Sequence, residues 1–192
     1  LGVTSEWSVN EKIAFDVALA AAMCGKRAAT TMKQVGLNVA SDSLMSAAYT
    51  GVEGGLVVVV CDDPGPHSSQ TEQDSRLFAL FAKVPVLDPA SPREAHAMAR
   101  EAFALSERHH LPVMLRPTTR VCHARQPVVP QPLDRLSRPA RFSKDPARWA
   151  ATPRFRLELH RKLNLKLEAL RQEFETAPFN REDAGEGDLG II

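Results

Sequence analysis

Residues 5–25, SEWSVNEKIAFDVALAAAMCG, decide how the rest of this chain is interpreted. Asn10 is a favourable N-cap residue, because its side-chain oxygen can accept a hydrogen bond from a free amide of the first helical turn. Residues 13–24 are almost wholly apolar, and a helix that is apolar on nearly every side is expected to be buried. A glycine then ends the run. The stretch predicts a buried helix over 10–24 with Glu11 in its first turn.

Two interpretations of Glu11 follow from this position. An acidic residue in the first turn of a helix commonly does no more than complement the helix dipole. A carboxylate at the start of a helix that enters an apolar core can instead act on a ligand, because the dipole favours the anion while burial opposes it. The residues that follow in the chain favour the second interpretation.

The composition describes a chain that can bury one good core. It has 192 residues, 44% of them hydrophobic, with 24 basic and 23 acidic side chains. This near balance gives no reason to expect binding to nucleic acid or to a membrane surface. No apolar run approaches the roughly 18 residues of a membrane span. The three cysteines, Cys24, Cys61 and Cys122, lack metal-ligand spacing, and we interpret them as buried, reduced thiols of a cytoplasmic protein.

Strands and helices alternate along the first two thirds of the chain. Strands are predicted near residues 28–32, 56–61, 84–87 and 111–116. Helices are predicted over 10–24, 37–49, 71–82 and 92–110. The strand LVVVVC at 56–61 is apolar without alternation, which is typical of a strand buried on both faces of a parallel sheet. The fold class is therefore α/β, with a mostly parallel sheet flanked by helices and then an extended connector and a long helix.

The domain organisation follows from a change of character near residue 121. Residues 1–121 are predicted to be the α/β domain, 122–152 a proline-rich connector, 153–176 a long helix, and 177–192 a hinge and the start of a further domain. We expect both ends to be cut from a longer polypeptide, with the N-terminal part of the domain missing.

Polar side chains are expected to gather where the strands end, since ligands of open parallel sheets bind outside the carboxyl ends of the strands. These residues are Lys33, Asn38, Asp62, Asp63, His67, Ser68, Ser69, Arg116, Thr118, Thr119 and Arg120. A rim rich in hydrogen-bond donors suits an anionic substrate such as a carboxylate. Each residue also has a simpler interpretation: the aspartates could cap a turn, His67 could bond its own loop, and Arg116 could pair with an acid.

Several segments together resemble a known family. They are EWSVNEK at 6–12, KQVGLNV at 33–39, DDPGPHSSQTEQD at 62–74, RPTTRV at 116–121, PFNR at 178–181 and GII at 190–192. The chain resembles the pyrimidine-binding domain of thiamine-diphosphate enzymes. Within that group it is most similar to the 2-oxoacid:ferredoxin oxidoreductases, in particular the alpha subunits of the indolepyruvate branch.

The resemblance implies a reaction and a set of partners. The reaction is the oxidative decarboxylation of an aryl 2-oxo acid to an acyl-CoA, with electrons passed through iron–sulfur clusters to ferredoxin. The cofactor is thiamine diphosphate with Mg²⁺. The diphosphate site and the clusters would lie outside these residues. The resemblance also implies a smaller beta subunit and an oligomeric enzyme.

The resemblance further implies roles for individual residues. Glu11 is the catalytic residue, which shares a proton with N1′ of the cofactor's aminopyrimidine. Val35, Gly36 and Asn38 form a cofactor-binding loop together with Glu11. The expected substrate-binding residues are His67, Ser68, Arg116, Thr118 and Thr119. No metal ligand is expected within the chain.

Two other functions stay open at this point. The first is an enzyme of the same superfamily that acts on pyruvate or a branched-chain 2-oxo acid, since nothing in the sequence fixes the acyl group. The second is a non-catalytic interaction domain that kept the fold and uses the basic helix at 154–174 as its docking surface.

Overall fold

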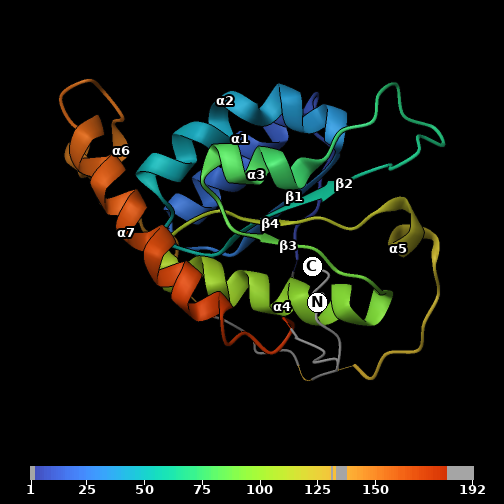
Figure 1. The fold of residues 1–192 in the computed structure, drawn as a ribbon. Coiled ribbons are helices and arrows are strands. Elements are labelled where there is room, and N and C mark those ends of the chain that lie inside the picture. The colour runs from blue at the N-terminus through green and yellow to red at the C-terminus, as the bar shows by residue number, and fades with distance from the viewer. Residues whose placement is uncertain (1–2, 131, 133–137, 181–192) are drawn as a thin grey trace, which may run out of the picture.

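Parallel strands form the sheet of the computed structural model, which describes residues 3–130, 132 and 138–180 (Figure 1). The strands are β1 (Ala28–Lys33), β2 (Leu56–Cys61), β3 (Val86–Leu87) and β4 (Val113–Leu115), in the order β1-β2-β4-β3. All three pairings are parallel. The predicted fold class is confirmed, and the last two strands are shorter than expected.

Strand β2 lies inside the sheet because its side chains have no polar face. Its residues pair with β1 on one side and with β4 on the other, so that Val58 lies opposite both Thr30 and Met114. Leu56, Val58 and Val60 are fully buried. Burial of this kind needs helices on both faces of the sheet.

Helices supply that cover (Figure 1). One face carries α1 (Glu11–Met23), α2 (Gln34–Thr50) and α3 (Ser75–Ala82), and the other carries α4 (Pro92–His109). The long helix α7 (Arg156–Phe174) crosses the edge at which the strands begin. Two short helices, α5 (Thr119–His123) and α6 (Pro146–Trp149), lie in the later part of the chain. The opposite edge, where the strands end, is left to the loops.

Side-chain caps set where three of the helices begin. Asn10 accepts a hydrogen bond from the amide of Ile13 at 3.0 Å and starts α1, as predicted. Ser91 caps α4, which has a proline in its first turn. The predicted start of α3 at residue 71 is wrong. Asp74 accepts from the amide of Arg76 at 3.0 Å and places the first helical residue at Ser75.

Helix α2 corrects a second prediction. The segment Val35–Asn38 was expected to be a loop before a helix at 37–49, but α2 begins at Gln34, directly after β1. The buried side chain of Gln34 donates to the carbonyl oxygen of Thr71 at 3.1 Å. This contact and the burial of Leu37 hold the first turn of α2 against the rest of the domain. Val35, Gly36 and Asn38 are therefore helical residues.

Helix α1 is only partly buried, contrary to the prediction from its composition. Phe15, Ala18 and Ala22 face the core, whereas Ile13 and Val17 are 42% and 49% exposed. The small side chains of the alanine-rich run let α1 pack closely on α2 and β1 with one stripe, so the remaining surface of the helix stays outside.

The prediction that the cysteines are buried is also wrong. Cys24 and Cys61 are half-buried and Cys122 is exposed, and all three are free thiols. Cys24 lies at the C-cap of α1 and Cys61 is the last residue of β2. Cys122 lies in the short surface helix α5.

The segment between α5 and α7 runs over the domain surface. The amide of Arg141 donates to the carbonyl oxygen of Cys24 at 2.9 Å, and Arg148 in α6 bonds Glu53 at 2.7 Å. The predicted long helix at 153–176 is present as α7. The division into domains stays a prediction, and residues 181–192, for which we predicted a hinge and the start of a further domain, lie outside the described residues. Within the part of the chain that the structure describes, no helix is both long and apolar enough to span a membrane.

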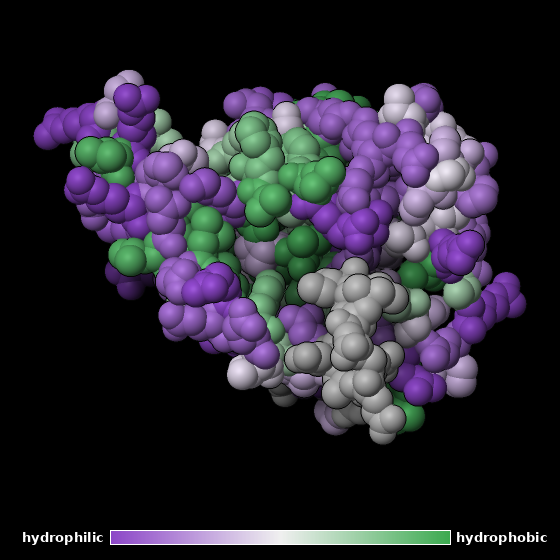
Figure 2. Space-filling model, viewed as in Figure 1, coloured by the Kyte–Doolittle hydropathy of each residue, from purple (hydrophilic) through white to green (hydrophobic). Residues whose placement is uncertain are grey.

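An apolar patch is visible over α3 in Figure 2. Its residues are Leu77, Leu80 and Phe81, each at least two-thirds exposed. Ala79 and Ala82, on the other side of the helix, are buried. Helix α3 thus packs on the domain through these alanines, Ser75 and Phe78, and presents three large apolar side chains to the surroundings.

We expect the core contact of α1 to dominate its contribution to stability. Phe15→Ala removes a fully buried ring and should lower the free energy of unfolding by about 3–5 kcal/mol. Ile13→Ala in the same helix is the matched control and should cost about 0.5 kcal/mol or less, because Ile13 is exposed. Urea unfolding followed by circular dichroism measures both. Equal losses would contradict the packing described here.

Candidate functional site

Glu11 and Gly36 meet beside the edge at which the strands end. Glu11 is the first residue of α1 and Gly36 lies in the first turn of α2. A Cβ atom at position 36 would lie 2.5 Å from Cγ of Glu11 and 2.9 Å from its carboxyl carbon. Only a glycine at this position lets the half-buried glutamate lie across the helix backbone.

The carboxylate of Glu11 is left available in this arrangement. Among the described residues it has no hydrogen-bond or ion-pair partner. The first turn of α1 instead places it near free backbone amides, and the helix dipole there favours a negative charge. A carboxylate held in this way can give or take a proton at a bound ligand.

Two buried polar atoms near the start of α2 also lack partners within the described chain. They are Oε1 of Gln34, whose side chain is fully buried, and Oγ of Ser69. The amide nitrogen of Gln34 is already used by Thr71. Buried polar atoms are almost always hydrogen-bonded, so these two atoms call for partners that the described residues do not supply. Sequence reasoning missed Gln34, although its position directly after a strand could have drawn attention to it.

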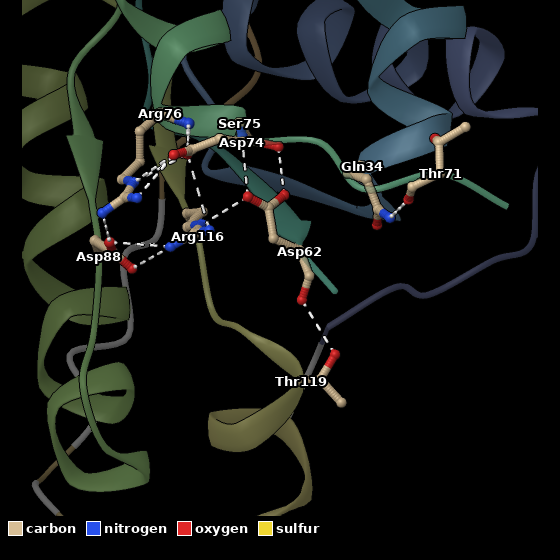
Figure 3. A network of polar contacts seen from close by, with 9 residues as sticks. All are labelled: Gln34, Asp62, Thr71, Asp74, Ser75, Arg76, Asp88, Arg116 and Thr119. Atoms are coloured by element: carbon tan, nitrogen blue, oxygen red, sulfur yellow. Dashed lines mark hydrogen bonds and ion pairs between the residues drawn. The ribbon is translucent and has the colours of Figure 1, made fainter. Parts of the chain in front are cut away.

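A buried ion pair lies under the same edge (Figure 3). Nε of Arg116 donates to Oδ2 of Asp62 at 2.6 Å, and the two side chains are 7% and 0% exposed. Ser75, the first residue of α3, adds two hydrogen bonds to the Asp62 carboxylate at 2.9 and 2.5 Å. Asp88, just beyond β3, accepts from Nη1 of Arg116 at 3.2 Å. The pair thereby connects the ends of β2, β3 and β4 to the start of α3.

Asp63 organises the loop that follows β2. Its Oδ2 atom accepts from the amides of His67, Ser68 and Ser69 at 3.0, 3.0 and 3.1 Å. Its Oδ1 atom accepts from the hydroxyl of Thr119 at 2.7 Å. The amide of Ser68, the hydroxyl of Thr119 and the remaining donors hold the pKa of Asp63 well below its ordinary value.

The predicted site residues lie in two separate groups, one at Glu11 and Gly36 and one around Asp63. Glu11 and Gly36 touch, while Val35 is half-buried and Asn38 exposed on α2. Asp63 connects Thr119 to the backbone of His67 and Ser68, whose side chains are exposed. Thr118 is the N-cap of α5 and half-buried.

Arg116 differs from the other predicted substrate contacts. Its Nε and Nη1 atoms are engaged by Asp62 and Asp88, and its side chain is buried. The structure thus gives Arg116 the ion-pairing role that was the simpler interpretation of this residue. A contact between Arg116 and a substrate stays a prediction.

Comparison with known protein families decides what kind of domain this is. Residues 8–172 match the sequence profile of the thiamine-diphosphate-binding domain of pyruvate flavodoxin/ferredoxin oxidoreductases. The chain belongs to this family. The match runs from Ser8, just before α1, almost to the end of α7, and so includes every element described above.

Curated relatives in this family are named indolepyruvate oxidoreductase subunit IorA. The relative from Thermococcus kodakarensis is 49% identical over 100% of this chain and 30% of its own length. The relative from Methanothermobacter thermautotrophicus is 47% identical over 100% of this chain and 31% of its own. The relative from Archaeoglobus fulgidus is 44% identical over 97% and 30%. The chain thus spans about a third of the length of these relatives.

A solved structure is similar in fold. The 2-oxoglutarate:ferredoxin oxidoreductase from Magnetococcus marinus, with 2-oxoglutarate, coenzyme A and succinyl-CoA bound, matches with a TM-score of 0.60. The match covers 94% of this chain and 38% of that one at 14% sequence identity. At this identity the similarity shows the fold alone.

The residues at the carboxyl edge fit the pyrimidine half of thiamine diphosphate. The unpaired Glu11 carboxylate can share a proton with a ring nitrogen, and Gly36 leaves the room that the Glu11 side chain itself occupies. The unused oxygen of Gln34 can accept from an amino group. Within the described residues no group of three or more His, Cys, Asp or Glu side chains could hold a metal ion.

The Asp62–Arg116 pair gives a prediction about stability. Arg116→Met removes one partner and leaves a carboxylate uncompensated in the interior, which should lower the free energy of unfolding by about 3–5 kcal/mol. Arg171→Met removes a cation whose partner Glu168 is exposed, and should leave the urea midpoint unchanged. An Arg116→Met protein as stable as the Arg171→Met control would show that the ion pair of Arg116 does not contribute to the free energy of unfolding.

Asp63 gives a prediction about acid. Since its pKa is lowered on folding, its contribution to stability is present above its unfolded pKa of about 3.9 and is lost as the pH falls below that value. Asp63→Asn should therefore be less stable than the parent protein at neutral pH, and the difference should shrink with acid. Urea midpoints at neutral pH and near the unfolded pKa measure it. A difference independent of pH would contradict the charged hydrogen-bonded state.

Proposed function

We propose that this chain is the pyrimidine-binding part of a thiamine-diphosphate-dependent 2-oxoacid:ferredoxin oxidoreductase that acts on aryl 2-oxo acids such as indolepyruvate. The observation that carries the proposal is the unpaired carboxylate of Glu11, laid across Gly36 at the start of α1. Membership of the family gives that carboxylate its ligand, and the names of the curated relatives favour the aryl substrate over pyruvate or branched-chain acids.

Glu11 acts by holding a proton at N1′ of the aminopyrimidine. Its carboxylate lies half-buried in the first helical turn, without a partner among the described residues. A proton can then be shared with the ring nitrogen. When bound, thiamine diphosphate supplies the carbon nucleophile and electron sink for decarboxylation. Gln34 and Gly36 orient the ring against Glu11 from the start of α2.

The loop after β2 and the start of α5 receive the 2-oxo acid. Asp63 uses the backbone amides of His67 and Ser68 and so fixes the loop, while their side chains stay exposed. These side chains, with the hydroxyl group of Thr118, offer donors to the substrate carboxylate. Thr119 supports the site instead, because its hydroxyl donates to Asp63. Arg116 contributes indirectly, because its hydrogen bond to Asp62 fixes the end of β2.

The remaining parts of the reaction lie outside this chain in our proposal. The diphosphate and Mg²⁺ need oxygen ligands in near-octahedral array together with phosphate. The iron–sulfur clusters, the coenzyme A and ferredoxin sites and a smaller beta subunit complete the enzyme. The curated relatives are about three times as long as the matched region, which leaves room for these parts.

Glu11→Gln tests the role of the carboxylate. The amide keeps the shape of the side chain but cannot exchange the proton, so turnover by the complete enzyme should fall by about 10²–10⁴-fold. The urea midpoint should not change. Glu6→Gln is the matched control, because Glu6 is exposed and precedes α1, and it should keep the parental rate. If the Glu11→Gln enzyme kept the parental rate, Glu11 would only complement the helix dipole and would have no catalytic role.

A second measurement tests where the cofactor is anchored. Residues 1–192 alone should bind thiamine diphosphate weakly or not at all with Mg²⁺ present. Each tenfold in affinity corresponds to about 1.4 kcal/mol, so the absence of a metal-bridged diphosphate should cost several orders of magnitude. Isothermal calorimetry decides it, and micromolar binding would show that the diphosphate site lies within these residues.

A further inference from the structure

Cys61 and Cys122 are far apart in sequence but lie at one corner of the fold. Cys61 is the last residue of β2, and the next residue, Asp62, forms a parallel bridge with Thr118. The amide of Thr119 donates to the carbonyl oxygen of Asp62 at 2.9 Å. These contacts fix the start of α5 beside the end of β2.

Helix α5 contains the second of these cysteines, Cys122. The amide of Cys122 donates to the carbonyl oxygen of Thr118 at 2.9 Å, so Cys122 lies one helical turn above the residue that bridges to Asp62. The bridge and this helical turn bring Cys122 to the corner at which Cys61 ends β2. Cys61 is half-buried, whereas Cys122 is exposed.

The geometry points to a dithiol modification site, at which Cys61 and Cys122 form a reversible disulfide upon reaction with a low-molecular-weight disulfide. Disulfides need Cβ atoms about 3.5–4.5 Å apart, and the bridge between Asp62 and Thr118 holds the two cysteine-bearing segments side by side. The site is separate from Glu11 and does not depend on the proposed function.

The difference in exposure assigns the two steps. The thiolate of Cys122 attacks one sulfur of the small disulfide, forms a mixed disulfide and releases one small thiol. The thiolate of Cys61 then attacks the Cys122 sulfur and releases the second small thiol. Two electrons pass from the cysteine pair to the small disulfide, and the two thiol protons leave on the released thiols. Burial and the neighbouring Cys122 raise the pKa of Cys61 to about 12, which suits it to the second step rather than the first.

The disulfide would join α5 to the end of β2 at the candidate site. Thr119 opens α5 and donates to Asp63, which in turn holds the loop with His67 and Ser68. Oxidation of the pair therefore fixes the corner from which the substrate donors are presented. Cys24 lies elsewhere, at the C-cap of α1.

Peptide mapping of the complete polypeptide tests the proposal. The protein is treated with glutathione disulfide under argon, alkylated and digested with trypsin. Cys61 and Cys122 fall in different tryptic peptides, 34–76 and 121–125, and Cys24 falls in 13–26. Mass spectrometry should find 34–76 joined to 121–125, and dithiothreitol should release the two. Cys24→Ser is the matched control and should give the same linked peptide.

Cys61→Ser separates the two steps. This variant should lose the linked peptide and accumulate glutathione on Cys122, because no second thiol displaces it. Cys122→Ser should leave Cys61 free of glutathione. The proposal is overturned if the parent protein keeps a stable glutathione adduct on Cys122, if Cys122 does not react, or if Cys24 takes part in the linkage.

Discussion

The carboxyl edge of this domain depends on the buried pair of Asp62 and Arg116. A carboxylate in the interior is costly unless it is both paired and hydrogen-bonded, and Asp62 has a guanidinium and two bonds from Ser75. These partners come from β4 and from the start of α3, and Asp88 adds the end of β3 through Arg116. One charge therefore fixes the mutual position of three strand ends and a helix start, beneath the loops that form the candidate site (Figure 3).

The next residue uses the same chemistry for a different purpose. Asp62 and Asp63 both follow an apolar strand, and both accept several hydrogen bonds, but Asp62 joins regular elements whereas Asp63 shapes a loop. Because backbone amides of the loop converge on Asp63, the side chains of His67 and Ser68 are left to the surroundings. The substrate donors in our proposal are thus positioned by a carboxylate that never contacts the substrate itself.

The contact of Glu11 with Gly36 shows how an active carboxylate can stay unpaired. A glutamate near a protein surface usually finds a lysine or an amide. Here its side chain lies against the bare backbone of α2 at Gly36, and Gln34 in the same helical turn also has an unpaired side-chain oxygen. The Glu11 carboxylate and the Gln34 oxygen therefore remain able to accept hydrogen bonds from a ligand. In the domain alone, a buried polar atom without a partner is unfavourable.

The sequence by itself determined the fold class, the approximate position of each strand, the role of Asn10 as a cap, and the family resemblance that singles out Glu11. These features are local: apolar runs, capping residues and turn residues act on their immediate neighbours in the chain. The extent of burial of α1 was misjudged, since composition cannot say which side of an alanine-rich helix meets α2. Only the tertiary structure decided that α2 begins at Gln34, that Gly36 touches Glu11, that Arg116 pairs with Asp62, and that the end of β2 meets the start of α5. Each of these facts depends on two segments distant in the sequence, which the parallel sheet and its crossovers bring to the same edge.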